Sequence, residues 1–522
     1  MIRQLEMAAA SDIVSGSVFY RFHSLKGTVG YAIRDFFIKE DIPPRQPVMI
    51  LDTLSVGMPA GDVTITGNSS TAPGYNIVGT SVPDKRLFLN GEEVTNRTVE
   101  GFFFVYVELD SGVNEFTFSQ EGQDDVTRKI TRNASGGGGG GGSEPSPPAP
   151  VITEVTTPRY ATINSDEAWV YATNPGAGGT GWMLTRGQRD RVVAESGTSY
   201  VKLSCGVWVS RSAVTIQNES VFKMDTLQSG QYRSSFYYDV LAWRSDVFTA
   251  VNATYDGRNL VLSFGMQTDV PSLDLPEGLS QTIFESVRSG KNGDTPYYSF
   301  TIKDDVKFEG YYVEYEDGEL LFNLKKRKTI AGGDLPLLGI TIMLDPGHGG
   351  EAAGAIGPLG EDLAEKELNL TNSLKLAERL EALGATVHLT RDTDKDISLQ
   401  ERVNMSRRVN PDLFISLHIN SVAETTNAKS IRGFTVWYRN PTSADLARTM
   451  LDFMFMINPG TNRERTINHA NYFVNRPAWS PTVLLEASFI INIDDFVWLI
   501  DPSEQDRMAD ATAEAILEYF SG

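Results

Sequence analysis

The chain has 522 residues, too many for one compact hydrophobic core, so its length predicts several domains. Its formal net charge is −21 at pH 7, and its Lys and Arg residues form no basic stripe that would neutralise a phosphate backbone. The charge therefore argues against a nucleic-acid partner. The single cysteine, Cys205, excludes an intramolecular disulfide and a cysteine-rich metal site, and its apolar neighbours predict a core residue.

Neither a membrane span nor an export signal is visible in the sequence. No run of about 18 apolar residues occurs, so we expect no transmembrane segment. Residues 1–15 lack the apolar stretch of roughly 7 to 15 residues that signal peptides contain. A removed or truncated export signal and a misassigned start would both explain this, and the sequence leaves the choice open. Residues 1–58 as a whole receive no assignment.

The clearest boundary is a segment rich in glycine and proline, residues 134–150. It contains seven consecutive glycines, Gly136–Gly142, followed by a proline-rich end. Glycines gain nothing from burial that would offset their loss of conformational freedom, so the segment is predicted to be a flexible linker. We therefore expect the unit before the linker to move independently of the rest of the chain.

Residues 59–133, before the linker, have the pattern of short β-strands. Leu87–Leu89 leads into Asn90 and Gly91, a two-residue hairpin signal, and aromatic residues predict a strand over 102–109. The phrases LFLNGEEV and EGFFFVYVELDSGVNEFTF resemble bacterial immunoglobulin-like modules. The resemblance implies a β-sandwich that spaces or displays other domains, with carbohydrate binding as the alternative role.

Residues 151–217, after the linker, again predict short strands. The phrase GVWV at 206–209 resembles a strand ending of SH3-like barrels, small modules that often bind wall peptides through exposed aromatic side chains. Trp169, Trp182 and Trp208 are the candidates for such binding. Aromatic residues of a small barrel are also common core residues, so both interpretations stay open.

Residues 218–332 form a third strand-rich region. Asn259–Phe264 and Gly310–Tyr315 alternate apolar and polar residues as half-buried strands do. Asp317 and Gly318 then predict a turn into the following strand. Together with the two preceding regions, this pattern predicts three all-β modules in a multidomain chain.

Residues 338–522 change to the pattern of alternating strands and helices. Ile340–Leu344 is a short apolar run typical of a buried strand, and Gly384 is placed to end a helix over 365–383. Such alternation predicts an α/β domain with a largely parallel sheet covered by helices on both faces. The other expected strands are 386–390, 413–419, 434–438 and 482–487, and the other expected helices are 399–409, 443–456 and 504–520.

Four side chains indicate chemistry at one edge of this sheet. His348, His418 and Glu486 each lie at the end of a predicted strand, where α/β sheets place their ligands. Glu365 begins the helix after the first strand and can return to the same edge. Two imidazoles and one carboxylate are the protein ligands of a zinc site with a position for water, and a remaining carboxylate can transfer protons.

Five phrases of this region, in the same order, resemble the zinc-dependent N-acetylmuramoyl-L-alanine amidases. The resemblance implies that His348, Glu365 and His418 bind Zn²⁺ and that Glu486 is the catalytic carboxylate, with no further cofactor site. The phrases are LDPGHGGEAAGAIG at 344–357, EKELNLTNSLKLAERL at 365–380, LTRDTD at 389–394, the stretch 399–421 and VLLEASFIIN at 483–492.

The resemblance also implies a function. The chain is expected to be a peptidoglycan hydrolase that cleaves the amide between N-acetylmuramic acid and L-alanine, by zinc-activated water with Glu486 as general base. Residues 218–332 are similar to the β domain that precedes the catalytic domain in many such enzymes. The expected partner is peptidoglycan and the expected location is extracellular or wall-associated. The oligomeric state stays unknown.

Two other functions fit the sequence, a catalytically silent wall-binding surface protein and a zinc amidase acting on another wall amide. Ala352, Ala353 and Ser488 depart from the family pattern at positions that are not ligands, which puts substrate fit in doubt rather than catalysis.

Three more polar side chains of this region fall outside the predicted zinc site. His388 and Arg391 are expected to be structural, the arginine by pairing with carbonyl groups or a carboxylate. His469 is a candidate for contact with the substrate.

Overall fold

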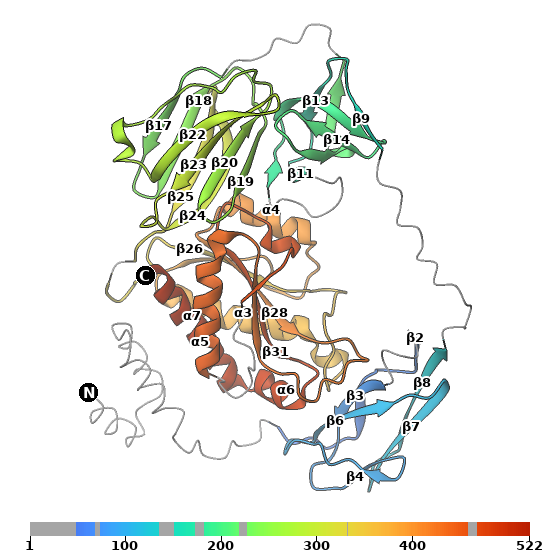
Figure 1. The fold of residues 1–522 in the computed structure, drawn as a ribbon. Helices are drawn as coiled ribbons and strands as arrows, with labels where there is room; N and C mark the ends of the chain where they lie inside the picture. The colour runs from blue at the N-terminus through green and yellow to red at the C-terminus, as the bar shows by residue number, and fades with distance from the viewer. Residues whose placement is uncertain are drawn as a thin grey trace.

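Four units make up the residues that the computed structural model describes, namely 49–67, 74–134, 151–166, 168–172, 182–218, 227–330, 332–457 and 467–522. Three units are strand-rich, and the fourth, at the C-terminus, is a mixed sheet covered by helices (Figure 1). The predicted linker lies outside the described residues except for Ala134. Within those residues, no helix is both long enough and apolar enough to cross a membrane.

The first β unit, residues 49–134, consists of two sheets that share a core, in which Tyr75 packs with Phe118 and other apolar residues. Asn90 and Gly91 have φ angles of 49° and 87°, as the predicted hairpin requires. The immunoglobulin-like type stays a prediction. One sheet contains β1 (Ser55–Met58), β3 (Gly74–Thr80) and β6 (Phe102–Glu108), and the other β2 (Val63–Gly67), β8 (Val126–Ala134), β7 (Gly112–Gln120), β4 (Leu87–Leu89) and β5 (Glu92–Glu93).

The second β unit, residues 151–217, is a single sheet of eight strands. Cys205 is fully buried, as predicted, and Trp182 and Trp208 are also core residues, whereas Trp169 is partly exposed. The SH3-like type stays a prediction. The strand order is β12 (Met183–Leu184), β11 (Ala168–Tyr171), β15 (Trp208–Ser210), β14 (Tyr200–Leu203), β13 (Arg189–Ser196), β10 (Tyr160–Ile163) and β16 (Val214–Gln217), with β9 (Ile152–Glu154) beside β13.

The third β unit, residues 227–330, has two sheets and shares one hydrophobic core with the second unit. Trp182 of the second unit stacks on Tyr311 of the third, with 5.6 Å between the ring centroids. The second and third units therefore share one continuous hydrophobic core. One sheet orders β21 (Leu273–Asp274), β17 (Gly230–Ser234), β18 (Tyr238–Arg244), β25 (Glu319–Lys326) and β24 (Phe308–Glu316), and the other β19 (Val251–Tyr255), β20 (Asn259–Phe264), β23 (Thr295–Ile302) and β22 (Phe284–Asn292).

The C-terminal domain, from residue 338 onward, contains a six-stranded sheet. Neighbouring strands are parallel except for β29 and β31, so the sheet is mixed and β29 and β30 run against the other four strands. The prediction of a largely parallel sheet thus holds for the part that carries the candidate site. The order is β27 (Thr386–Leu389), β26 (Thr341–Pro346), β28 (Leu413–Asn420), β31 (Thr482–Phe489), β29 (Phe434–Tyr438) and β30 (Ile467–His469).

Helices pack on both faces of this sheet because its buried strands alternate between two apolar clusters. Leu344 and Leu485 face a large cluster that includes residues of α3, α5, α6 and α7. Met343 and Leu484 face a smaller cluster with α4. The helices are α3 (Glu365–Ala382), α4 (Leu399–Val409), α5 (Ala444–Ile457), α6 (Ile493–Ile500) and α7 (Pro502–Ser521), of which α6 was not predicted.

The first β unit packs against the C-terminal domain, so the expectation that it moves independently is wrong. Phe102 is fully buried, and its ring meets Phe496 of α6 edge-on at 5.1 Å between centroids. β1 pairs with β3, so this unit also begins before the expected boundary at residue 59. Linker composition determines the stiffness of the linker, but it does not determine whether apolar surfaces on its two sides meet.

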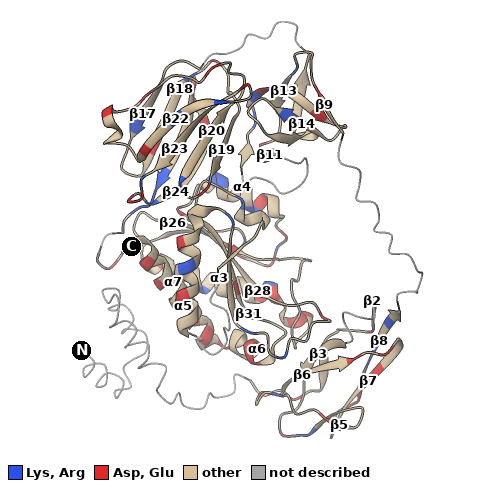
Figure 2. Cartoon of the chain, viewed as in Figure 1, with Lys and Arg blue, Asp and Glu red and all other residues tan. Residues whose placement is uncertain are grey.

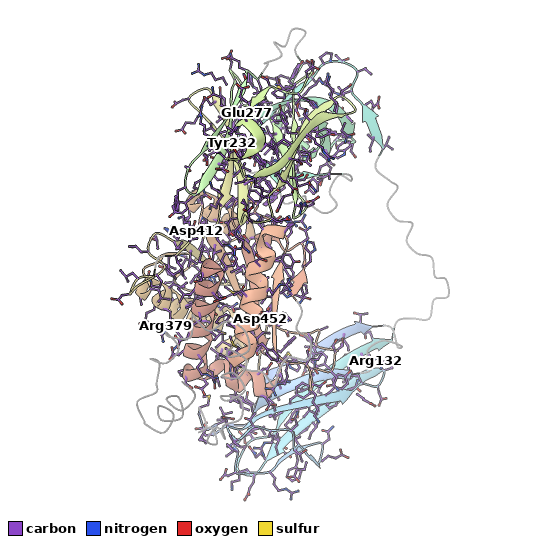
Figure 3. All side chains as sticks on the ribbon, turned by 60° about the vertical axis from the view of Figure 1, so that its left-hand side comes forward. Arg132, Tyr232, Glu277, Arg379, Asp412 and Asp452 are labelled. Carbon is purple, nitrogen blue, oxygen red and sulfur yellow. The ribbon has the colours of Figure 1, made fainter. Side chains whose placement is uncertain are left out.

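The C-terminal domain lies between the other units. Figure 1 shows the first β unit at one end of it and the second and third β units at the other. In the turned view of Figure 3, Arg132 marks the first unit, Arg379 and Asp452 the C-terminal domain, and Tyr232 and Glu277 the third unit. Acidic and basic residues are interspersed over all four units (Figure 2).

Candidate active site

The loop after β26 brings His348 to the carboxyl edge of the sheet. His348 has a φ of 59°, in the left-handed region that residues with a side chain seldom adopt, so the surrounding contacts hold a strained backbone. A Cβ on the preceding Gly347 would come within 2.3 Å of the His418 ring. The glycine therefore allows the loop to approach β28, and the two imidazole centroids lie 5.0 Å apart.

Glu365, the first residue of α3, points into the same edge and is 4% exposed. Its Oε1 accepts hydrogen bonds from the Ile419 N–H and from Asn369 Nδ2, both at 3.1 Å. Its Oε2 accepts from the Ala355 N–H at 2.8 Å. These donors fix the carboxylate in one orientation.

His348, Glu365 and His418 meet at one point, with one ligand atom from each lying within 4.8 Å of the others. His348 Nε2 is 3.2 Å from Glu365 Oε2, and His418 Nδ1 is 3.0 Å from Oε1. Burial would raise the pKa of Glu365, but the hydrogen bonds with both histidines hold it well below its usual range. Burial would lower the pKa of His418, but the Glu365 carboxylate raises it.

These three residues fit a divalent metal such as zinc. Two imidazole nitrogens and a carboxylate oxygen are a donor set that zinc uses in proteins. Gly354 lies beside them, and a Cβ there would come within 2.6 Å of Glu365 Oε2 and 2.8 Å of His348 Cδ2. The glycine thus keeps a side chain out of the space next to the donors.

Glu486 lies on β31, paired in register with His418 on the neighbouring β28. Its Oε2 is buried and has no hydrogen-bond partner in the part of the chain that the structure describes. Burial raises the pKa of Glu486 to about 7, with His418 lowering it and Glu365 raising it. A carboxyl group that titrates near neutral pH can both accept and return a proton.

A buried ion pair beneath the site was missed in the sequence. Arg402 of α4 donates to Asp345 Oδ1 at 2.6 Å and to the His348 carbonyl at 2.7 Å. Asp345 also accepts from the hydroxyl groups of Thr390 and Ser416, so its charge is fully bonded. Asp345 and Arg402 both belong to the phrases that resemble the family. The sequence alone does not show that these two side chains form an ion pair.

The other polar candidates are not among the three donors. Arg391 is buried and donates to the carbonyls of Pro346, Gly347 and Lys366, which agrees with the predicted structural role. His388 is exposed on the edge strand β27. His469 is on β30, with Nε2 2.9 Å from the Arg439 carbonyl oxygen.

The departure at Ser488 has a structural consequence. Its φ is 71°, in the left-handed region that glycine adopts without strain. Its hydroxyl is buried and has no hydrogen-bond partner within the described ranges. Both facts explain why a glycine would be favoured at this position. Ala352 pairs with Gly349 in the loop after His348.

Comparisons with known proteins cover this domain. Residues 342–518 match the family described as N-acetylmuramoyl-L-alanine amidase. The N-acetylmuramoyl-L-alanine amidase LytC of Bacillus subtilis (strain 168) is 35% identical over 185 residues, which are 35% of this chain and 36% of LytC. The uncharacterized protein YqiI of the same organism is 32% identical over 186 residues, covering 35% of this chain and 87% of YqiI.

A solved structure covers the same region. The N-acetylmuramoyl-L-alanine amidase AmiC2 of Nostoc punctiforme is 31% identical in sequence, and the match covers 37% of this chain and 100% of the chain in that structure, with a TM-score of 0.33. The match therefore spans about a third of the length of LytC but all of the chain in that solved structure.

Proposed function

Because the chain belongs, through residues 342–518, to the N-acetylmuramoyl-L-alanine amidase family, we propose that it is a zinc-dependent peptidoglycan hydrolase. The bond cleaved is the amide that joins N-acetylmuramic acid to the L-alanine of the stem peptide. The observation that carries the proposal is the meeting of His348, Glu365 and His418 at one point, with the Glu486 carboxyl beside them.

His348, Glu365 and His418 would hold the zinc ion. Zinc bound in such a site lowers the pKa of its water to about 7 and polarises a carbonyl group. Glu486, whose buried Oε2 has no partner among the described residues, would take a proton from the attacking water and return it to the departing amine of L-alanine. Arg402, through Asp345 and the His348 carbonyl, keeps the His348 loop in position.

Glu486→Gln tests the proposed base. The change keeps the size of the side chain but removes the group that accepts a proton, so turnover of soluble muropeptides should fall on the order of 10²–10⁴-fold. Zinc content, measured by metal analysis of the purified protein, should be unchanged. Loss of zinc would show that Glu486 is a ligand, and unchanged turnover would remove it from the reaction.

His418→Ala tests the proposed ligand set. The variant should lose most of its zinc and its activity, because one of three donors is missing. His388→Ala is the matched control, since His388 is exposed on β27, and it should retain both. A His418→Ala protein with full zinc occupancy would contradict the assignment.

The proposed substrate implies an extracellular or wall-associated location. A silent wall-binding protein remains the alternative from a different class, and it predicts no release of products from purified wall by the zinc-loaded chain. A zinc amidase acting on another wall amide predicts products that differ in their new amino terminus.

A further inference from the structure

A row of partly exposed aromatic side chains begins beside Glu486 and consists of Trp437, Tyr472, Phe473, Trp169 and Tyr171. Tyr472 is 41% exposed, and its pKa is raised by burial and by the negative charge of Glu486. The Tyr472 ring meets Trp437 of β29 edge-on, with 5.4 Å between centroids. Trp437 Nε1 donates to the hydroxyl of Thr435, which pairs in register with Glu486. The row therefore starts at the candidate general base.

The row continues through the 3₁₀ turn η6 (Phe473–Asn475) to the second β unit. The rings of Phe473 and Trp169 lie 5.4 Å apart, and Trp169 Nε1 donates to Gln400 of α4 at 3.3 Å. Tyr171, two residues further along β11, meets Tyr200 edge-on at 5.6 Å. Aromatic side chains of the second unit thus extend the surface of the C-terminal domain.

Arg476 supplies a positive charge in the middle of this row. Its guanidinium lies 4.7 Å from the Phe473 ring centroid and 5.7 Å from that of Trp169, and its Nε donates to Asn471 Oδ1 at 3.0 Å. Among the described residues, no carboxylate forms an ion pair with Arg476. Burial lowers the pKa of Arg476. The pKa of the nearby Arg439 is lowered by burial and by the positive charge of Arg476. Two guanidinium groups therefore concentrate positive charge on a protein of net charge −21.

We propose that this row binds the stem peptide of the substrate, with a peptide carboxylate paired to Arg476 and apolar parts of the peptide lying on Tyr472, Phe473 and Trp169. This inference rests on the proposed function, since it places the peptide that begins at the scissile bond. Guanidinium groups pair with carboxylates in a bidentate manner, and every peptide ends in one. A neutral glycan could stack on the same rings, but it would leave the charge of Arg476 without a partner.

Arg476→Ala tests the proposal with two soluble muropeptides that differ only in whether the peptide carboxylates are free or amidated. For the free-carboxylate substrate KM should rise roughly tenfold, the usual effect of losing one charge-assisted hydrogen bond, while kcat changes little. For the amidated substrate both values should stay near those of the unchanged protein. Arg476→Lys should restore part of the loss.

Arg186→Ala is the matched control, because Arg186 is an exposed arginine of the second β unit that pairs with Asp166. Arg186→Ala should leave kcat and KM unchanged for both substrates. A merely structural role of Arg476, in docking the second unit, would change the kinetics of both substrates alike. That result would overturn the proposal, as would identical kinetics of Arg476→Ala and the unchanged protein.

A binding measurement separates failure of this inference from failure of the proposed function. The full-length Glu486→Gln protein is titrated with a free peptide that begins with L-alanine and carries two carboxylates, and the tryptophan fluorescence is followed. Binding weakened by Arg476→Ala supports the inference even if no muropeptide is cleaved. Cleavage without any discrimination between the two substrates refutes the inference alone. The inference would be refuted if the free peptide did not bind and an N-acetylated glycan lacking peptide did. Weaker glycan binding by Tyr171→Ala would then show that the row binds glycan.

Discussion

The first and second β units both pack on the C-terminal domain, but the second contact includes side chains that stay partly exposed. The first unit inserts Phe102 and Phe104, 0% and 3% exposed, into the apolar cluster that contains α6. The second unit meets the domain through Met183, which is buried against Val403 and Trp479. Around this small cluster lie Trp169, Phe473 and Arg476, which remain partly exposed.

The buried side chains hold the units together, whereas the partly exposed ones remain available to bind a substrate. Burial of apolar area stabilises in proportion to the area removed from water, so the first interface should dominate stability. A partly exposed aromatic surface contributes less and leaves its rings and charges available to a ligand. We therefore expect substitutions in the first interface to change unfolding, and those at the partly exposed side chains of the second interface to change substrate kinetics.

The largest effect is expected for Phe102→Ala. Removing this fully buried ring from its contact with Phe496 should cost about 3–5 kcal/mol of stability. Hydrogen exchange of α6 and thermal unfolding of the full chain would show the loss. Val113→Ala, at a position 66% exposed in the same unit, is the control and should change little. Unaltered hydrogen exchange in α6 would mean that the contact between Phe102 and the C-terminal domain does not stabilise the protein.

Asn76→Ala should have an intermediate effect. Asn76 is fully buried, donates to the Thr426 carbonyl at 2.7 Å and accepts from the Ala428 N–H at 3.3 Å. Loss of both bonds should cost about 1–3 kcal/mol and speed hydrogen exchange in the loop 421–432. Tyr106→Phe removes a single bond to Thr425 and should cost less. Equal exchange in all three proteins would contradict the role given to Asn76.

Trp169→Ala should cost less stability than Phe102→Ala, because its ring is only partly buried where it packs on Phe473 and on the cluster of Met183, Val403 and Trp479. KM for muropeptides with free carboxylates should rise instead. Denaturant unfolding and steady-state kinetics would measure the two effects on the same preparation. A stability loss as large as that of Phe102→Ala would remove the distinction between the two interfaces.

A separate, pH-dependent effect on stability concerns α7, which packs on α3 and α5. Burial raises the pKa of Glu514 from 4.5 to about 7, and Asp510 adds to the shift. The folded protein thus favours the protonated form, so its stability falls as pH rises from about 4.5 to about 7. Glu514→Gln should lack this loss, matching the unchanged protein at low pH and exceeding it above neutrality. Unfolding at several pH values would reveal it, and a pH-independent difference would contradict it.

The elements that carry the candidate site could be predicted from the sequence because each has a strong local signal. A buried parallel strand is a run of apolar residues, and His418 and Glu486 stand where two such runs end. α6 was missed because its eight residues are too few to distinguish a short helix from a buried strand of the same length. The pair Asp345–Arg402 was missed because a buried ion pair joins residues 57 apart in sequence.

The first interface was not predicted, although β6 contained a signal for it. Phe102, Phe103 and Phe104 are consecutive, so they point to alternate sides of the strand. Phe103 enters the core of the first unit, whereas Phe102 and Phe104 enter the cluster of the C-terminal domain. Apolar residues without alternation indicate a strand buried on both faces, but a single sequence does not identify what covers the second face.

The most direct test of the central claim is mass spectrometry of the products that the zinc-loaded full chain releases from purified peptidoglycan. Cleavage of the amide at N-acetylmuramic acid predicts whole stem peptides with a free amino terminus on L-alanine, together with glycan strands that have lost their peptides. The Glu486→Gln protein should release almost none. Products cut within the peptide cross-links, or no products from the zinc-loaded chain, would contradict the account.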